Sequence, residues 1–163
     1  MTGYFYDSSG YARGFIKDGD NFEVIEHEKA DSAACAYDLP CGTFLTGINN
    51  SGHVVGVFTD TGGYYRGFLK DGDGYAAIDY SPNNAINTWV GGINDSGRTV
   101  GCFYGSDGYA RGFIKTGNNF EIIEHPDAAR NGDGTYVLGI NNSGQIVGWF
   151  DDGERSHGFS LSN

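Results

Sequence analysis

The chain has 163 residues, of which 28 are glycine, 3 are proline and 15% are aromatic, and its formal net charge is −11. This length fits one domain that can bury a core, and the aromatic content argues against disorder. The negative charge disfavours nucleic acid and anionic membrane surfaces as partners, since both bind basic surfaces, and no apolar run approaches the ~18 residues of a membrane span.

A sequence unit recurs along the chain and indicates a repeat architecture. The unit begins with Gly-Ile-Asn at Gly47, Gly92 and Gly139, so its steps are 45 and 47 residues. A period of about 45 residues is typical of four-stranded propeller blades. We therefore treat residues 1–163 as one repeat domain with units at approximately 2–46 (partial), 47–91, 92–138 and 139–163 (partial).

The first, partial unit predicts three strands and an insertion. The expected strands are GYF at 3–5, YARGFIK at 11–17 and NFEVIEH at 21–27. Cys35 and Cys41 flank the inserted loop ACAYDLPCG, and we expect them to form a disulfide if the protein matures in an oxidising compartment. The opening residues show no basic and apolar leader, so no signal peptide is predicted.

The second unit predicts four strands. They are TFLTGIN at 43–49, HVVGVF at 53–58, YYRGFLK at 64–70 and GYAAIDY at 74–80. The Asn-Asn-Ser-Gly cluster after Gly-Ile-Asn predicts a turn whose glycine takes a left-handed conformation. Gly56 lies inside an apolar strand, and its recurrence in every copy indicates close approach of a neighbouring backbone.

The third and fourth units repeat this pattern. The expected strands are NTWVGGIN at 87–94, RTVGCF at 98–103, YARGFIK at 109–115, NFEIIEH at 119–125, TYVLGIN at 135–141, QIVGWF at 145–150 and SHGFSLS at 156–162. Cys102 lies in one of these apolar strands, so we expect a buried free thiol. Tight Lys-Asp-Gly-Asp or Lys-Thr-Gly-Asn hairpins join the last two strands of each complete unit.

These patterns predict an all-β, β-propeller-like array of four repeat-derived antiparallel sheets, because no segment shows a helical period. The alternatives are a β-solenoid or half of an intermolecular propeller. The first and last units lack a strand each, and unpaired strand edges invite another chain. A homodimer is therefore expected, with a self-closed four-sheet monomer as the alternative.

The motif GINNSGxxVGxF, followed by GxxRGF or HGF and an aromatic-x-x-Ile strand, resembles the extracellular HAF-type repeat family. The resemblance covers nearly the whole chain outside the loops. It implies a propeller-like fold, a secreted or cell-surface location and no assigned activity. The histidine that this family places before Gly-Phe stands here only at His157.

Four cations occupy equivalent positions before Gly-Phe, at Arg13, Arg66, Arg111 and His157. Such a set would hold an anion if it surrounded a common centre. The alternative is local pairing, either with backbone carbonyls or with the acids of the last strand of the first three units, which are Glu26, Asp79 and Glu124.

Aromatic side chains lie near the long connections that would emerge on one face of a propeller. The ligand-binding candidates among them are Tyr11, Tyr64, Tyr109 and Trp89. Aromatic rings beside amides and carboxylates stack on sugars and hydrogen-bond to them, so the expected ligand is a carbohydrate or a protein surface.

The sequence contains no catalytic motif, predicts no cofactor, and predicts no metal site. The Asp-Gly-Asp segments at 18–20 and 71–73 are explained by hairpin turns, since they lack the later acidic ligand of a calcium loop. We expect a non-catalytic binding or adhesion module of β-propeller type. The alternatives are a small propeller enzyme, hydrolase or lyase, with its site on the loop face or in a central channel, and a structural fragment of a longer repeat array.

Overall fold

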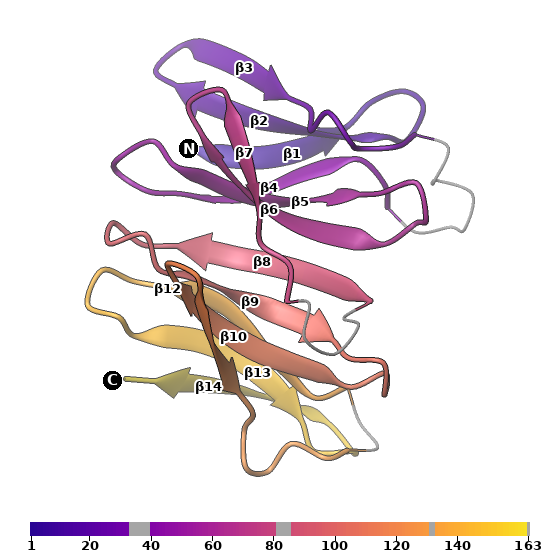
Figure 1. Cartoon of the computed structure of the whole chain (residues 1–163), viewed down its shortest axis with the longest axis vertical. Coiled ribbons are helices and arrows are strands. Elements are labelled where there is room, and N and C mark those ends of the chain that lie inside the picture. The colour runs from indigo at the N-terminus through magenta and orange to yellow at the C-terminus, as the bar shows by residue number, and fades with distance from the viewer. Residues whose placement is uncertain (33–39, 81–85, 131–132, 163) are drawn as a thin grey trace.

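The computed structural model describes residues 1–32, 40–80, 86–130 and 133–162. These residues form an all-β structure of 14 strands in four antiparallel sheets, and no helix occurs among them. Figure 1 shows the four sheets following one another along the longest axis, with the first sheet near one end and the last near the other.

The sheets follow the repeats in chain order. The first contains β1 (Thr2–Tyr6), β2 (Ala12–Asp18) and β3 (Asn21–Ile25). The second contains β4 (Thr43–Ile48), β5 (Val54–Thr59), β6 (Tyr65–Asp71) and β7 (Gly74–Ala77). The third contains β8 (Asn87–Ile93), β9 (Thr99–Tyr104), β10 (Ala110–Thr116) and β11 (Asn119–Ile123). The fourth contains β12 (Thr135–Ile140), β13 (Ile146–Asp151) and β14 (Ser156–Leu161).

All predicted strands are present, but the last strand of each of the first three units ends earlier than expected. The sequence pattern extended these strands to His27, Tyr80 and His125, whereas β3, β7 and β11 end two or three residues before them. The reason is packing against the next sheet. The His27 ring stacks on Phe58, with ring centroids 3.9 Å apart, and His125 stacks in the same way on Phe150 at 3.7 Å.

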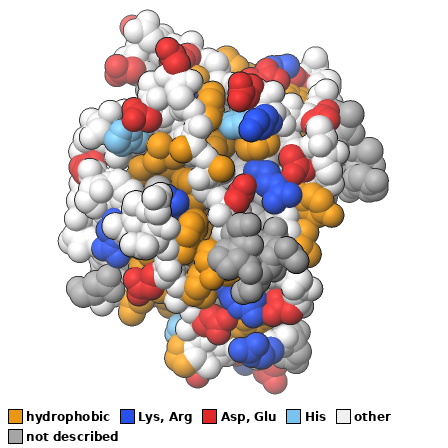
Figure 2. Space-filling view, in the orientation of Figure 1, with side chains coloured by type: hydrophobic (Ala, Val, Ile, Leu, Met, Phe, Trp, Pro, Cys, Tyr) orange, Lys and Arg blue, Asp and Glu red, His pale blue; other side chains and the backbone are white. Residues whose placement is uncertain are grey.

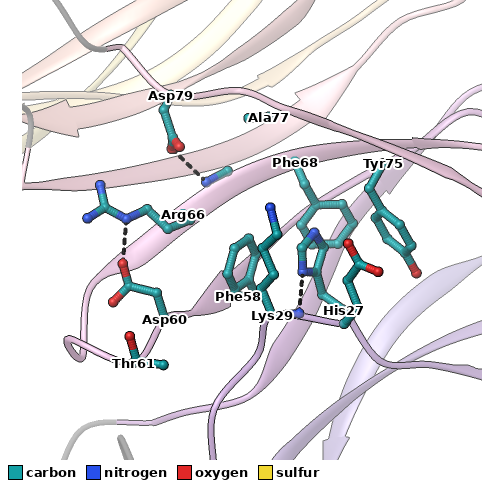
Figure 3. Close-up of a pocket in the computed structure, with 12 residues that line it drawn as sticks. His27, Lys29, Phe58, Asp60, Thr61, Arg66, Phe68, Tyr75, Ala77 and Asp79 are labelled. Carbon is teal, nitrogen blue, oxygen red and sulfur yellow. Dashed lines mark hydrogen bonds and ion pairs between the residues drawn. The ribbon is translucent and has the colours of Figure 1, made fainter.

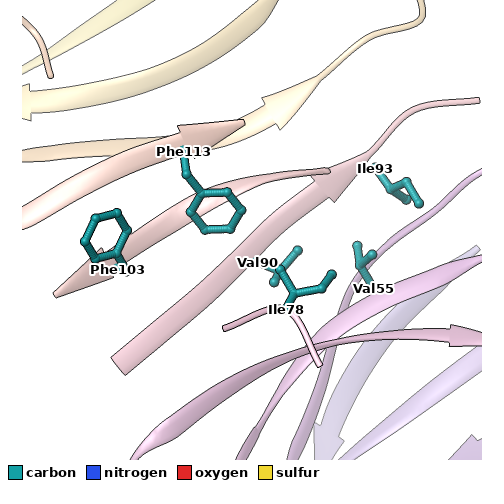
Figure 4. Close-up of a cluster of buried hydrophobic side chains, with 6 residues drawn as sticks. All are labelled: Val55, Ile78, Val90, Ile93, Phe103 and Phe113. Carbon is teal, nitrogen blue, oxygen red and sulfur yellow. The ribbon is translucent and has the colours of Figure 1, made fainter. Parts of the chain in front are cut away.

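Neighbouring sheets contact each other through the first strand of the later sheet. β4 packs on β1 and β2, β8 packs on β5 and β6, and β12 packs on β9 and β10. Each interface buries an apolar cluster. The cluster between the second and third sheets contains Val55, Ile78, Val90, Ile93, Phe103 and Phe113, all at most 8% exposed (Figure 4). The face seen in Figure 2 carries charges of both signs with hydrophobic side chains between them.

In the second, third and fourth units, the glycine inside the strand that follows the Asn-(Asn/Asp)-Ser-Gly turn is confirmed as a point of close backbone approach, whereas a Cβ at Gly3 of the first unit would meet the Phe15 ring. A Cβ at Gly101 would lie 2.0 Å from the carbonyl oxygen of Trp89 on the paired strand β8. A Cβ at Gly56 would lie 2.3 Å from the carbonyl oxygen of Phe44, and one at Gly148 would lie 2.0 Å from that of Tyr136. The register of β4, β8 and β12 shifts beside these contacts, so each glycine accommodates a β-bulge in its partner strand.

The Gly-Ile-Asn-(Asn/Asp)-Ser-Gly motif forms the predicted turn and also joins sheets. Its last glycine has positive φ in each copy, for example 82° at Gly52. Within the turn, the Asn49 carboxamide oxygen accepts hydrogen bonds from the backbone N–H groups of Ser51 and His53. Its nitrogen donates to the carbonyl of Asn94 in the next sheet at 3.1 Å. The motif is therefore an inter-sheet contact as well as a turn.

The cysteines occupy different environments. Cys102 is a free thiol and is 3% exposed, as the sequence predicted, and burial raises its pKa to about 12. Cys41 is also buried. Cys35 lies outside the described residues, so the Cys35–Cys41 disulfide stays a prediction. No described helix is long and apolar enough to cross a membrane.

Candidate functional site

The four candidate cations lie at equivalent positions, and each pairs with an acid of its own sheet. Arg13 Nε lies 2.9 Å from Asp7 Oδ2, Arg66 Nε lies 2.7 Å from Asp60 Oδ2, Arg111 Nη2 lies 2.7 Å from Asp107 Oδ2, and His157 Nε2 lies 2.7 Å from Asp152 Oδ2. Among the described residues, no ion pair or hydrogen bond links one of these cations to another. The geometry is that of local pairing, but the partner that all four cations share is a loop aspartate that was not predicted from the sequence.

The tyrosine two residues before each arginine lies beside the guanidinium group. The distance from the guanidinium carbon to the ring centroid is 5.4 Å for Arg13 and Tyr11. It is 5.4 Å for Arg66 and Tyr64, and 5.1 Å for Arg111 and Tyr109. These distances are within the range of cation–π attraction. Tyr11 and Tyr109 are buried, whereas Tyr64 is 42% exposed. The second sheet is thus more open at this position than the first and third.

The second sheet also differs in its acid. In the first and third sheets, a glutamate at the end of the last strand closes on the arginine, with Arg13 Nη1 to Glu26 Oε2 at 2.5 Å and Arg111 Nε to Glu124 Oε1 at 2.8 Å. The second sheet has Asp79 there, and its carboxylate instead accepts a hydrogen bond from the Gly67 backbone N–H at 3.3 Å. The aspartate is one methylene shorter, which explains why this pair stays open.

A cavity of about 500 Å³ opens beside Arg66 and Asp79. Figure 3 shows Arg66, Asp60 and Asp79 at one end, and Phe58, Phe68, His27 and Tyr75 toward the other. The remaining lining residues are Glu28, Lys29, Thr61, Gly67 and Ala77. The cavity therefore has an end where Arg66, Asp60 and Asp79 meet and an end rich in aromatic rings, where Lys29 also lies, and we call it the Arg66–Asp79 cavity.

Asp60 and Asp79, which face Arg66, have pKa values shifted in opposite directions. Burial raises the pKa of Asp79, and the Arg66 guanidinium only partly opposes this. For Asp60, burial also acts to raise the pKa, but the hydrogen bonds from Arg66 and from the backbone of Tyr64 and Gly62 outweigh it and lower the pKa. The Asp60–Arg66 pair is thus well satisfied, whereas the Asp79 carboxylate is desolvated without an equivalent partner.

A second cavity, of about 520 Å³, lies over the first strands of the later sheets. Its lining residues come from three sheets and are Tyr65, Asn87, Trp89, Cys102, Tyr104, Tyr136 and Leu138. The rings form two edge-to-face pairs, Tyr65 with Trp89 at 5.5 Å and Tyr104 with Tyr136 at 6.1 Å between centroids. We call it the aromatic cavity.

The aromatic cavity is neutral and offers a few polar groups. Burial raises the pKa values of Tyr104 and Tyr136, whose hydroxyl groups are hydrogen-bonded to each other. The Asn87 side-chain oxygen accepts the Tyr65 backbone N–H at 2.8 Å, and its amide nitrogen has no hydrogen bond among the described residues. No lining residue is an Asp, Glu, Lys, Arg or His, so the cavity presents aromatic surface, an amide and phenol groups.

Sequence reasoning named Trp89 but missed its partners. Tyr65, Tyr104 and Tyr136 belong to three different sheets, and only the packing of consecutive sheets brings them together. The unpaired position of Asp79, by contrast, could have been predicted from the sequence. Aligning the repeats places Asp79 where the other units have Glu26 and Glu124, and the shorter side chain predicts a broken pair.

No cluster of three or more His, Cys, Asp or Glu side chains suited to a metal ion occurs within residues 1–32, 40–80, 86–130 and 133–162. Comparison with known proteins finds no family model that matches the chain and no match among the curated proteins.

Proposed function

We propose that this chain is a non-catalytic carbohydrate-binding module of β-propeller type, and that the aromatic cavity holds the sugar. The observation that carries the proposal is the convergence of Tyr65, Trp89, Tyr104 and Tyr136 from three sheets on one neutral cavity. Sugar rings stack their C–H faces on aromatic side chains, while their hydroxyl groups need a few well-placed polar partners. Here Asn87 and the paired tyrosine hydroxyl groups are those partners.

The chemistry of the lining favours binding over turnover. Glycoside hydrolysis uses a pair of carboxyl groups on either side of the scissile bond. The aromatic cavity contains no carboxyl group, and its one thiol, Cys102, has a pKa of about 12 because it is buried. A sugar bound there has no general acid or nucleophile within the lining set, so we assign the cavity to recognition.

The propeller form of the array, membership of the HAF-type repeat family and an extracellular location belong to the same proposal. The repeated sheet order and the packing of each first strand on the preceding sheet support the radial arrangement. A small-angle scattering curve that fits an extended flat stack rather than a curved array would contradict it.

Isothermal titration calorimetry with a panel of neutral mono- and oligosaccharides tests the binding proposal. Trp89→Ala should weaken binding by about two- to tenfold, since stacking on one ring is worth roughly 0.5–1.5 kcal/mol. Leu138→Arg supplies a second variant that keeps the core, because Leu138 is 47% exposed and a longer side chain there would enter the cavity.

Tyr64→Ala is the matched control, because Tyr64 is an exposed aromatic outside this cavity. It should leave sugar affinity unchanged. Retention of full affinity in Leu138→Arg would overturn the assignment of the cavity, and release of reducing sugar during incubation would favour the enzyme alternative.

A further inference from the structure

The Arg66–Asp79 cavity is a second candidate ligand site, and it shares no lining residue with the aromatic cavity. The sister sheets show what its arginine position is built to contact. In the first and third sheets, a second carboxylate, from Glu26 or Glu124, fills the guanidinium edge that the loop aspartate leaves open. Each of those arginines therefore lies between two carboxylates.

In the second sheet this second carboxylate is missing. Arg66 uses Nε to contact Asp60, and neither Nη1 nor Nη2 makes a hydrogen bond within the described part of the chain. The side chain of Arg66 is 29% exposed, so these nitrogens are accessible. Guanidinium groups bind carboxylates strongly and in a defined orientation. A ligand carboxylate would occupy the place that Glu26 and Glu124 take in the sister sheets.

Asp79 restricts which carboxylate can bind. Its carboxylate stays near Arg66 and would repel a simple anion, as would Asp60. A ligand that also carries a positive charge next to its carboxylate removes this conflict, because the cation pairs with Asp79. One charged group alone would leave either Arg66 or Asp79 unsatisfied.

The aromatic lining of the cavity indicates that the ligand also has an apolar group. Phe58, Phe68, Tyr75 and His27 line the end away from Arg66 and Asp79, with Lys29 beside Phe58 and His27 (Figure 3). Phe58 and Phe68 are 7% and 1% exposed, so they form a fixed apolar floor rather than mobile surface side chains. His27 stacks on Phe58 and lies against Tyr75 at 4.5 Å, which completes this floor.

We propose that the Arg66–Asp79 cavity binds an apolar α-amino acid, with its carboxylate on Arg66, its ammonium group on Asp79 and its side chain against the aromatic floor. The charges of Arg66 and Asp79 match the two charged groups of the ligand, and the cavity of about 500 Å³ is large enough for an amino acid of this kind. This site is independent of the carbohydrate proposal.

Calorimetric titration of the full chain with leucine and with phenylalanine tests this proposal. N-acetyl-leucine lacks the ammonium group and leucine methyl ester lacks the carboxylate. Each should bind at least about tenfold more weakly than leucine, because each loses one charge-assisted hydrogen bond and leaves one charged side chain of the site without a partner.

Asp79→Glu is the decisive variant because it restores the residue of the sister sheets. The longer side chain should close on Arg66, keep the fold and abolish leucine binding. Arg66→Lys should weaken binding while retaining a cation beside Asp60, because lysine lacks the planar fork. Leu138→Arg, which blocks the aromatic cavity, is the control and should bind leucine like the wild type.

Leucine binding that survives in Asp79→Glu overturns the proposal, and so does equal affinity for leucine and its two blocked derivatives. A third result would also overturn the proposal: the wild type binds no amino acid, and Asp79→Glu loses sugar binding. The Arg66–Asp79 cavity would then bind the hydroxyl groups of a sugar. Loss of sugar binding in Leu138→Arg bears only on the aromatic cavity, so the two sites fail separately.

Discussion

Asn94 donates a hydrogen bond from its side-chain amide to the backbone carbonyl of Asn141, 3.2 Å away in the next sheet. Asn49 makes the same contact with Asn94 one sheet earlier, at 3.1 Å. The residue after each asparagine adds to the link, because the Asp95 carboxylate accepts hydrogen bonds from the side chains of both Asn50 and Asn142. The most regular motif of the sequence thus connects three successive sheets.

We predict that Asn94→Ala lowers the free energy of unfolding by about 1–3 kcal/mol, because it leaves buried partners of the turn and of the inter-sheet contact unsatisfied. Asn94 is 3% exposed. Asn141→Ala is the control, since Asn141 makes the same turn but its amide contacts Gln145 in its own sheet. Urea unfolding should show a smaller loss for Asn141→Ala, and equal losses would argue against the inter-sheet role.

Gly101→Ala should destabilise the third sheet more than a glycine substitution without a close neighbour. Its Cβ would lie 2.0 Å from the Trp89 carbonyl oxygen, which is backbone and cannot move aside cheaply. Overpacking of this kind costs about 1–3 kcal/mol or more. Gly139→Ala is the matched comparison, because its nearest neighbour is a Val147 methyl group at 3.5 Å. Thermal unfolding of the two variants should separate them clearly.

Stability should fall as the pH drops from 7 toward 4 because of His27. Burial lowers the pKa of His27 to about 4 in the folded chain, against an ordinary value of 6.5. Between these values the unfolded chain binds a proton that the folded chain does not, so the stabilisation present above pH 6.5 is lost as the pH falls. The equivalent residue of the second unit is Tyr80, so His27→Tyr is a natural replacement. Urea unfolding at several pH values should show that the free energy of unfolding depends less on pH in His27→Tyr than in the wild type.

We predict that the chain associates as a homodimer through the faces of its terminal sheets. Val147 is 50% exposed in the fourth sheet, whereas the equivalent Val55 of the second sheet is fully buried against the third. Phe22 and Val24 of the first sheet are 53% and 48% exposed. Exposed apolar groups on sheet faces that are covered elsewhere in the array mark an interaction surface.

Light scattering after size exclusion should give about twice the monomer mass of 17.5 kDa. Val147→Lys should shift the protein toward the monomer, whereas Ile86→Lys, at an exposed apolar residue outside the terminal sheets, should not. A wild-type mass of one chain at high concentration would contradict this prediction.

The strands and turns were predictable because they depend on local chemistry. Apolar and β-branched segments between recurring turn motifs predicted every strand, and glycines with positive φ stand at the turns, such as Gly52 with φ of 82°. The ends of β3, β7 and β11 were not predictable, because His27 and His125 leave their sheets to stack on rings of the next one.

By itself the sequence determined the all-β class, the repeat and the approximate strand positions, since these follow from residues close together in the chain. Only the tertiary structure decided which of these residues form sites. Trp89 became part of a cavity because Tyr65 and Tyr136 approach it from other sheets, and the Arg66–Asp79 cavity opened because one methylene is missing from an otherwise repeated pair. Both outcomes depend on distances between sheets, which side-chain packing sets and a single repeat does not contain.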